Sequence, residues 1–134
     1  MTWRWLFALL ALVGCHREPV APLPQRAYVW QREWTPAVSE AARQADTSLL
    51  NGLMLFGAEI AWDQGKPRII YGSIDWASVR RLHRPMGIAL RVAPHSGPFV
   101  ADDLASRTIC DTAQLLLGKM KAEGVPCAEF HLDF

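Results

Sequence analysis

The stretch GLMLFGAEIAW, residues 52–62, decides the fold class because it is apolar at almost every position. A strand with one face in water alternates apolar and polar residues, whereas a strand covered on both faces is apolar nearly throughout. Strands of the second kind are typical of parallel sheets whose strands are connected by helices. Residues 52–62 therefore indicate a central, buried strand of an α/β protein.

Three other stretches have the composition of main strands. AYVWQR at 27–32 is rich in β-branched and aromatic residues, GIALRVAP at 87–94 is mostly apolar, and CAEFHLDF at 127–134 alternates. The turn-like DQGK at 63–66 is followed by PRIIYG at 67–72, which we expect to fold back as a short hairpin arm.

Helical stretches lie between these strands. Thr35 and Pro36 mark the start of one helix, because threonine caps helices well and proline is tolerated at the first helical position. We expect a short helix over 74–82 and a long helix over 102–123 that stops at Gly124. Strands that alternate with helices run parallel and are joined by right-handed crossovers. The prediction is an α/β fold, the first half of a (β/α) TIM-like barrel with about four parallel strands and the hairpin arm, since a full barrel has eight strands and about 250 residues.

The first residues have the form of a secretory leader. MTWRWLFALLALVGC contains one early basic residue, an apolar run too short to span a bilayer, and a cysteine at position 15. The segment Leu12-Val13-Gly14-Cys15 resembles the lipobox of bacterial lipoproteins, in which the cysteine is acylated. The alternatives are an ordinary signal peptide or a buried strand that includes Cys15. We therefore predict a lipoprotein signal peptide over 1–14, a proline-rich tether over 15–26 and the folded domain over 27–134.

Acylation of Cys15 predicts the location of the protein. A cysteine carrying two acyl chains is held stably at a bilayer, whereas a single chain gives weak, reversible binding. We expect the domain to be anchored in the bacterial envelope and to face the periplasm, with the lipid bilayer as its partner.

The charge balance argues against nucleic acid as a partner. Loss of Arg4 with the signal peptide would leave equal numbers of basic and acidic residues, and duplex binding requires a dense basic surface. The one basic run, Arg80 to Arg84, has the composition of a solvated helix end.

Cys110 and Cys127 remain after Cys15 is assigned to lipid. About thirteen helical residues would separate them by ~20 Å, far more than the roughly 7 Å between bridged Cα atoms. We therefore expect two buried, free thiols. No pair of cysteine or histidine residues has the spacing of metal ligands, so we predict neither a metal site nor a cofactor.

Candidate functional residues lie at the carboxyl ends of the predicted strands, where α/β folds bind ligands. These are Glu59, His95 and Asp133. Alternation along the last strand places Glu129, His131 and Asp133 on one face. Phe130, Leu132 and Phe134 take the other face, where we expect them to pack on helices.

Two interpretations of the inward polar residues stay open. One is an internal salt-bridge network that joins Glu59, Arg91, Glu129 and His131. The other is a carboxylate pair, Asp133 with Glu59, that performs glycoside chemistry. In the second case Trp34 and Trp62 would stack on sugar rings, and Arg91 and His95 would complete the substrate-binding set.

Four blocks of sequence carry a family resemblance. AYVWQREWTPAV at 27–38, GAEIAW at 57–62, IALRVAP at 88–94 and GVPCAEFHLDF at 124–134 resemble the opening part of the bacterial lipoprotein family called Domain of Unknown Function 3142. The resemblance implies a barrel related in form to glycoside hydrolases, without an established activity. It also implies a longer chain, because members of that family continue beyond the strand that corresponds to 127–134.

Two functions follow from these patterns. The first is a membrane-anchored lipoprotein with a truncated glycoside-hydrolase-like barrel, inactive in this form and with carbohydrate as its ligand. The second is a non-catalytic envelope domain that binds glycan or another protein through its open sheet edge.

Overall fold

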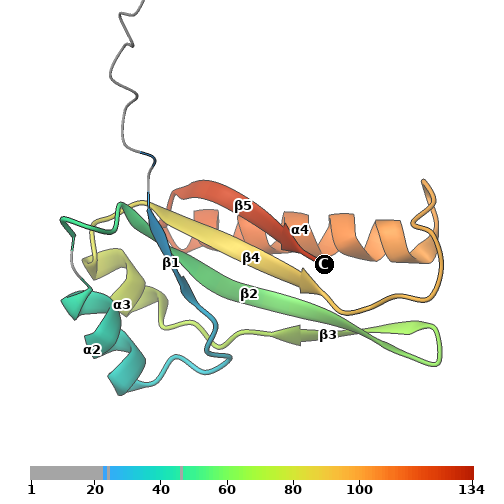
Figure 1. The fold of residues 1–134 in the computed structure, drawn as a ribbon, viewed down its shortest axis with the longest axis horizontal. Helices are drawn as coiled ribbons and strands as arrows, with labels where there is room; N and C mark the ends of the chain where they lie inside the picture. The colour runs from blue at the N-terminus through green and yellow to red at the C-terminus, as the bar shows by residue number, and fades with distance from the viewer. Residues whose placement is uncertain (1–22, 24, 46) are drawn as a thin grey trace, which may run out of the picture.

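A computed structural model of the chain describes residue 23 and residues 25–45 and 47–134 (Figure 1). The predicted signal peptide and Cys15 lie outside the described residues, as does most of the tether. The elements are β1 (Arg26–Val29), α2 (Pro36–Gln44), β2 (Gly52–Asp63), β3 (Lys66–Tyr71), α3 (Trp76–Arg81), β4 (Met86–Val92), α4 (Leu104–Ala122) and β5 (Cys127–Asp133). The predicted α/β fold class and mostly parallel sheet are confirmed.

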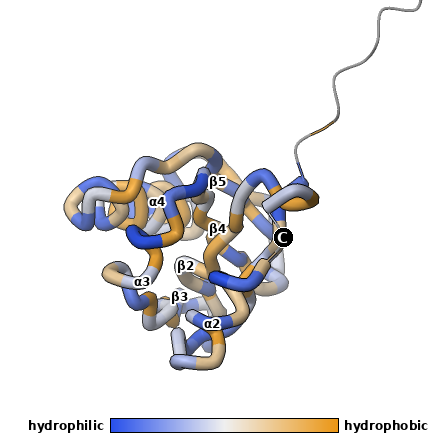
Figure 2. Tube along the Cα trace, turned by 90° about the vertical axis from the view of Figure 1, so that its left-hand side faces the viewer, coloured by the Kyte–Doolittle hydropathy of each residue, from blue (hydrophilic) through white to orange (hydrophobic). Residues whose placement is uncertain are grey.

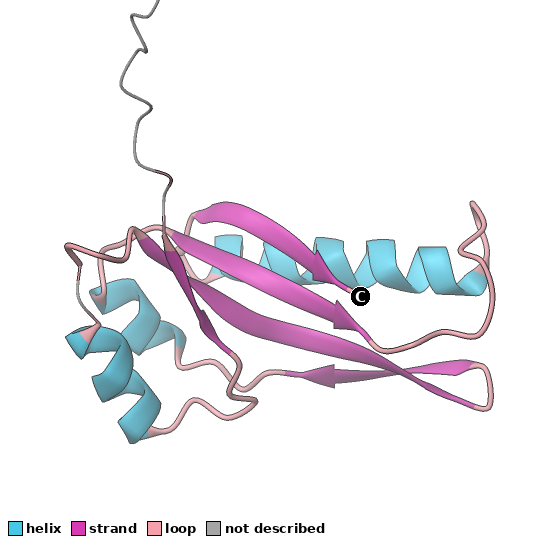
Figure 3. Ribbon diagram, viewed as in Figure 1, coloured by secondary structure: helices cyan, strands magenta, loops and turns pink. Residues whose placement is uncertain are grey.

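The sheet is built around β2, as its apolar sequence predicts. The main strands lie in the order β1-β2-β4-β5, and each neighbouring pair is parallel. Strand β3 folds back against β2 as the predicted hairpin arm, and its arrow points against the others in Figure 3. Gln64 and Gly65 at the hairpin tip both have positive φ, which matches the twist of paired strands.

Strands β1 and β3 share one edge of β2. β1 pairs with Gly52–Leu55, and β3 pairs with Ala58–Asp63 farther along. The chain beyond β1 then bridges to the segment that follows β3, since the Ser73 amide donates to the Arg32 carbonyl at 2.7 Å. The insertion of β3 therefore moves the end of the first strand away from β2 at the carboxyl end of the sheet.

The helices pack on a single face of the sheet. Leu116 and Met120 of α4 join Ile88 and Leu90 of β4 in one core cluster, to which α2 and α3 also contribute buried residues. Figure 2 shows α3 and α4 to one side of β2 and β4 and the C-terminus to the other. The Thr35 hydroxyl caps α2 by accepting from the Val38 amide, as predicted from sequence.

On the opposite, inner face of the sheet, central residues of β2 are buried although no helix of the described residues packs there. Met54 and Phe56 of β2 are 0% and 4% exposed on this face. Trp30, just beyond β1, contacts Phe56 with ring centroids 6.2 Å apart, and Arg26 of β1 reaches Glu129 of β5 across the same face at 2.6 Å. In a flat sheet these strands would lie three spacings apart, about 14 Å. The sheet is therefore curled, with its two outer strands turned toward each other.

Two details differ from the sequence-based expectation. Phe130 packs against the core as predicted, but Leu132 and Phe134 are 46% and 72% exposed, because α4 packs mainly against β2 and β4 and does not cover the end of β5. Cys110 and Cys127 are free, as predicted, yet both are exposed rather than buried. Cys110 follows the buried Ile109 and points away from the core, and Cys127 begins an outer strand.

The packing predicts a contrast between two neighbouring leucines. Leu90 of β4 is fully buried and pairs in register with Leu132 of β5, which is half exposed. Leu90→Ala should lower the free energy of unfolding by about 2–5 kcal/mol, the usual cost of emptying a core leucine site. Leu132→Ala is the matched control and should cost less than about 1 kcal/mol. Urea unfolding of both variants measures the difference, and equal losses would contradict the described core.

Candidate functional site

The inner face of the curled sheet carries a row of charged side chains at the carboxyl ends of the strands. Glu59 of β2, Arg91 of β4 and Asp133 of β5 are register partners and share this face. Arg32, which follows β1, donates from Nη2 to Glu59 Oε2 at 2.6 Å. Arg91 Nε lies 3.8 Å from Asp133 Oδ2. We call Arg32, Glu59, Arg91 and Asp133 the charged row.

The charged row alternates in sign and is accessible to water. The side chains of Arg32, Arg91 and Asp133 are 54%, 55% and 48% exposed, whereas that of Glu59 is 13% exposed. One strand, β4, separates Glu59 from Asp133, so their Cα atoms lie two strand spacings apart, about 10 Å. The structure thus brings together the two predicted catalytic carboxylates and places the predicted ligand Arg91 between them.

A pair of stacked aromatic rings lies beside the charged row, toward the amino-terminal end of the sheet. Tyr28 and Trp30 on the β1 side have ring centroids 5.1 Å apart and planes inclined by 7°. Trp30 also contacts Phe56 of β2, at 6.2 Å between centroids. Both stacked rings are more than two-fifths exposed. They form an open aromatic surface on the inner face. This surface adjoins the charged row, because Trp30 is two residues from Arg32 and alternation places both on the same face.

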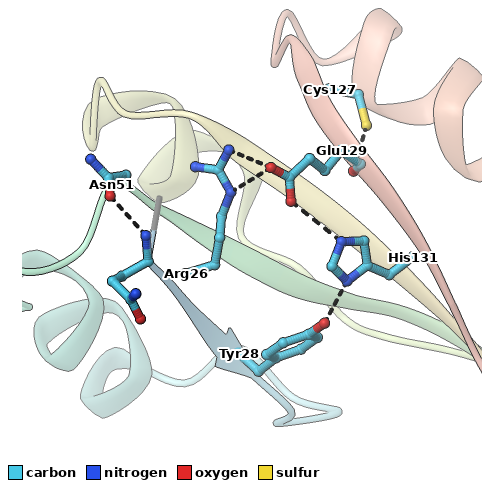
Figure 4. Close-up of polar contacts among 7 residues, drawn as sticks. Arg26, Tyr28, Asn51, Cys127, Glu129 and His131 are labelled. Atoms are coloured by element: carbon cyan, nitrogen blue, oxygen red, sulfur yellow. Dashed lines mark hydrogen bonds and ion pairs between the residues drawn. The ribbon is translucent and has the colours of Figure 1, made fainter. Parts of the chain in front are cut away.

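A chain of polar contacts that includes Tyr28 joins β1 to β5 across the inner face (Figure 4). The Tyr28 hydroxyl hydrogen-bonds with His131 Nδ1, and His131 Nε2 lies 3.3 Å from Glu129 Oε2. Arg26 donates to Glu129 Oε1 from both Nε and Nη2, at 3.0 and 2.6 Å. These contacts hold the two outer strands together across the inner face.

The ion pair in this chain shifts the ionisation of both partners. The hydrogen bond from Arg26 holds the pKa of the Glu129 carboxyl below its ordinary value, and the positive charge of Arg26 acts in the same direction. The same hydrogen bond raises the pKa of Arg26. Each partner therefore stabilises the charged form of the other.

The predicted aromatic and histidine ligands fall into two places. Trp62 and His95 are in contact, with centroids 4.4 Å apart, and Phe99 extends the cluster from His95 toward Phe134. The Trp62 indole donates to the Ala93 carbonyl at 3.1 Å, which fixes it at the rim. Trp34 lies elsewhere and does not join this rim cluster. Its indole donates to the Ser39 hydroxyl at 2.7 Å, and it lines a hollow beside α2 and α3.

The internal salt-bridge network expected from sequence forms with different partners. Glu129 and His131 are joined as predicted, but Glu59 pairs with Arg32 and Arg91 pairs with Asp133. Sequence reasoning missed Tyr28, Trp30 and Arg32. The signal for them was the alternation of large polar and aromatic residues from Arg26 to Arg32, which places every second side chain on one face.

Comparison with known proteins adds no relative. No family model, no curated protein and no solved structure matches the chain. The resemblance to Domain of Unknown Function 3142 stays a prediction. Within the part of the chain that the structure describes, no helix has the length and apolar character needed to cross a bilayer.

The Arg26–Glu129 pair predicts a pH-dependent contribution to stability. The pKa of the Glu129 carboxyl in the folded state lies below the ordinary value of 4.5. The stabilisation by the pair is therefore complete above pH 4.5 and is lost as the pH falls through the folded pKa. Glu129→Gln should lower the thermal midpoint at neutral pH, and the difference from the parent should shrink as the pH falls below 4.5. Thermal unfolding followed by circular dichroism measures this.

The control for this prediction is Glu33→Gln, because Glu33 is exposed and lies beyond the end of β1. Its thermal midpoint should follow that of the parent at every pH. A loss in Glu129→Gln that stays constant through the acid range would show that the pair does not contribute in the way described.

Proposed function

We propose that the chain belongs to a membrane-anchored lipoprotein and that its domain is a glycoside-hydrolase-like barrel segment that binds carbohydrate without hydrolysing it. Support for the barrel comes from the helices, which pack on one face of a curled, mostly parallel sheet. A doubly wound sheet has helices on both faces, whereas a barrel has them only on the outside. The charged row lies at the carboxyl ends of the strands, the position of ligand sites in such barrels.

The alternation of donors and acceptors along the charged row is the observation that favours carbohydrate. Arg32 and Arg91 only donate hydrogen bonds, and the ionised carboxylates of Glu59 and Asp133 only accept them. A sugar hydroxyl does both, so neighbouring hydroxyls of a sugar ring match a row of alternating donors and acceptors. The exposed faces of Tyr28 and Trp30 offer an apolar surface for the C–H face of the same sugar.

The surroundings of the two carboxylates favour binding over hydrolysis. A glycosidase needs one carboxyl group in an environment that keeps it protonated, such as an apolar pocket. Glu59 instead contacts the Arg32 guanidinium, and Asp133 lies beside that of Arg91. Neither residue lies in the apolar surroundings that a catalytic acid requires.

Hydrolysis is the second candidate function, because two carboxylates share one face at the carboxyl ends of the strands. Glu59 and Asp133 are both register partners of Arg91, one on each side of it. Glycosidases use a pair of carboxyl groups that flank the scissile bond. Release of reducing ends from bacterial or plant polysaccharides, abolished in Glu59→Gln, would support hydrolysis in place of binding alone.

The binding proposal predicts the effect of single changes in the row. Asp133→Asn and Glu59→Gln keep the shape of each side chain but remove the charge that accepts hydrogen bonds. Each should weaken glycan binding about tenfold or more, because a hydrogen bond to a charged group contributes about 1.5–3 kcal/mol. A glycan array identifies the ligand, and titration calorimetry with that glycan measures the change.

The control is Glu40→Gln on α2, whose carboxylate pairs with Arg43 and lies outside the inner face. It should bind glycan as the parent does. The thermal midpoint of Asp133→Asn should stay close to that of the parent, because Asp133 is half exposed. A large drop in its midpoint, or equal binding by all three variants, would refute a glycan site in the charged row.

Anchoring has its own test at Cys15. We expect the mature protein to begin at an acylated Cys15, to sediment with membranes and to carry the mass of the lipid on its N-terminal peptide. Cys15→Ser should abolish both the processing and the added mass, because the hydroxyl cannot form the thioether that holds the lipid. Mass spectrometry of the membrane fraction decides, and an unmodified N-terminal peptide in the parent would exclude the lipoprotein.

A further inference from the structure

The carboxyl ends of α2, α3 and α4 meet at the amino-terminal end of the sheet. Arg80 of α3 donates to the carbonyl of Glu123, the residue that caps α4, at 2.8 Å. Arg84, in the loop before β4, donates from Nη2 to the carbonyl of Ala45, which caps α2, at 3.3 Å. The helix ends and the amino ends of the strands thus form one surface, seen from the front in Figure 2.

This surface is rich in basic side chains. Every described helix has basic residues in its last turn, which complement the negative end of the helix dipole. The basic residues of this end are Arg43, Arg80, Arg81, His83, Arg84, Lys119 and Lys121. Among the described residues, the acids near these basic residues include Glu40 and Glu123, which are engaged in ion pairs. Glu129 near the start of β5 pairs with Arg26 at the start of β1, and Asp75 lies within electrostatic reach of Arg81. Asp46 lies outside the described residues.

A hollow in the same surface contains an incompletely paired guanidinium. The hollow measures about 730 Å³, and its lining includes Arg80, His83, Arg84, Pro126 and Cys127. Nε and Nη1 of Arg84 are shielded from solvent and have no hydrogen-bond partner among the described residues. Buried donors of this kind are normally satisfied, so the positive charge of Arg84 in the wall of the hollow is only partly compensated by the described residues and attracts an anionic group.

The start of β1 lies at this end of the sheet. The Gln25 amide donates to Asn51 Oδ1 at 2.8 Å, and the Asn51 amide donates to the Gln25 carbonyl at 2.8 Å. Gln25, the residue before β1, is thereby fixed beside the start of β2. Leu23 and Leu49, both at this end, are 77% and 68% exposed. Exposed leucines among basic residues are the composition of a surface that lies on a bilayer.

We propose that the amino-terminal end of the sheet docks on an anionic phospholipid surface, with lipid phosphate in the Arg84 hollow. The proposal rests on the proposed anchoring at Cys15, which decides which end of the domain meets the bilayer. Docking on this end points the charged row away from the membrane. Anionic headgroups attract clusters of lysine and arginine within a Debye length of the surface.

The chain carries its own probes for this orientation. Cys127 lines the basic hollow. Cys110 lies in the first half of α4, whereas the basic residues of that helix, Lys119 and Lys121, lie in its last turn. Both thiols are free and belong to exposed residues. Docking should therefore shield Cys127 from an uncharged, water-soluble maleimide and leave Cys110 open to it.

The experiment compares labelling of the full chain on vesicles of phosphatidylcholine alone and with phosphatidylglycerol, assigned peptide by peptide. We expect phosphatidylglycerol to slow labelling of Cys127 about fivefold or more relative to Cys110. A gain of about fivefold in membrane affinity is what one cation near an anionic surface contributes. Salt at about 0.5 M should remove the protection. Equal rates for Cys127 on both vesicles, or equal protection of both thiols, would overturn the proposal.

Charge variants separate docking from anchoring. The double variant Arg81→Gln with Lys121→Gln, both exposed, should lose the protection of Cys127, whereas Arg107→Gln near the start of α4 should keep it. If the chain fails to sediment with phosphatidylcholine vesicles but Cys127 is protected on phosphatidylglycerol, the lipid anchor is refuted and docking is supported. Firm sedimentation with an unprotected Cys127 would support the anchor and refute docking.

Discussion

The inner face of β2 has to be buried although none of the helices that the structure describes covers it. Met54 and Phe56 are almost completely shielded from water, and exposure of two such side chains would cost several kcal/mol, since each contributes about 1.5–3. Trp30 covers part of Phe56, and the two outermost parallel strands meet across this face through Arg26–Glu129 and Tyr28–His131. The curl of the sheet follows from this need for cover.

The candidate site lies on the same inner face. Strand register places Glu59, Arg91 and Asp133 side by side, and the chain beyond β1 brings Arg32 to Glu59. The basic residues collect at the other end of the strands, where the helices finish. One sheet therefore presents hydrogen-bonding groups of both signs at one end and a mainly basic surface at the other, which suits a domain held between a membrane and its ligand.

Much of the fold could be predicted because it depends on local patterns. The apolar run of β2, the threonine cap of α2 and the turn before β3 each require only neighbouring residues. The partners of Glu59 could not be predicted, because they depend on where β3 displaces the end of the first strand and brings Arg32 to it. The exposure of Phe134 was missed for a similar reason, since alternation gives the face of a residue but not what covers that face.

The contact between the two outer strands is the most direct test of the curled sheet. In the full chain, nuclear Overhauser effects between ring protons of Tyr28 and His131 report a separation that only the curl allows, since their centroids lie 5.8 Å apart. We predict clear cross-peaks between the two rings at neutral pH. Cross-peaks from Tyr28 to Trp30 without any to His131 would show that the outer strands stay apart and that the charged row is not assembled as described.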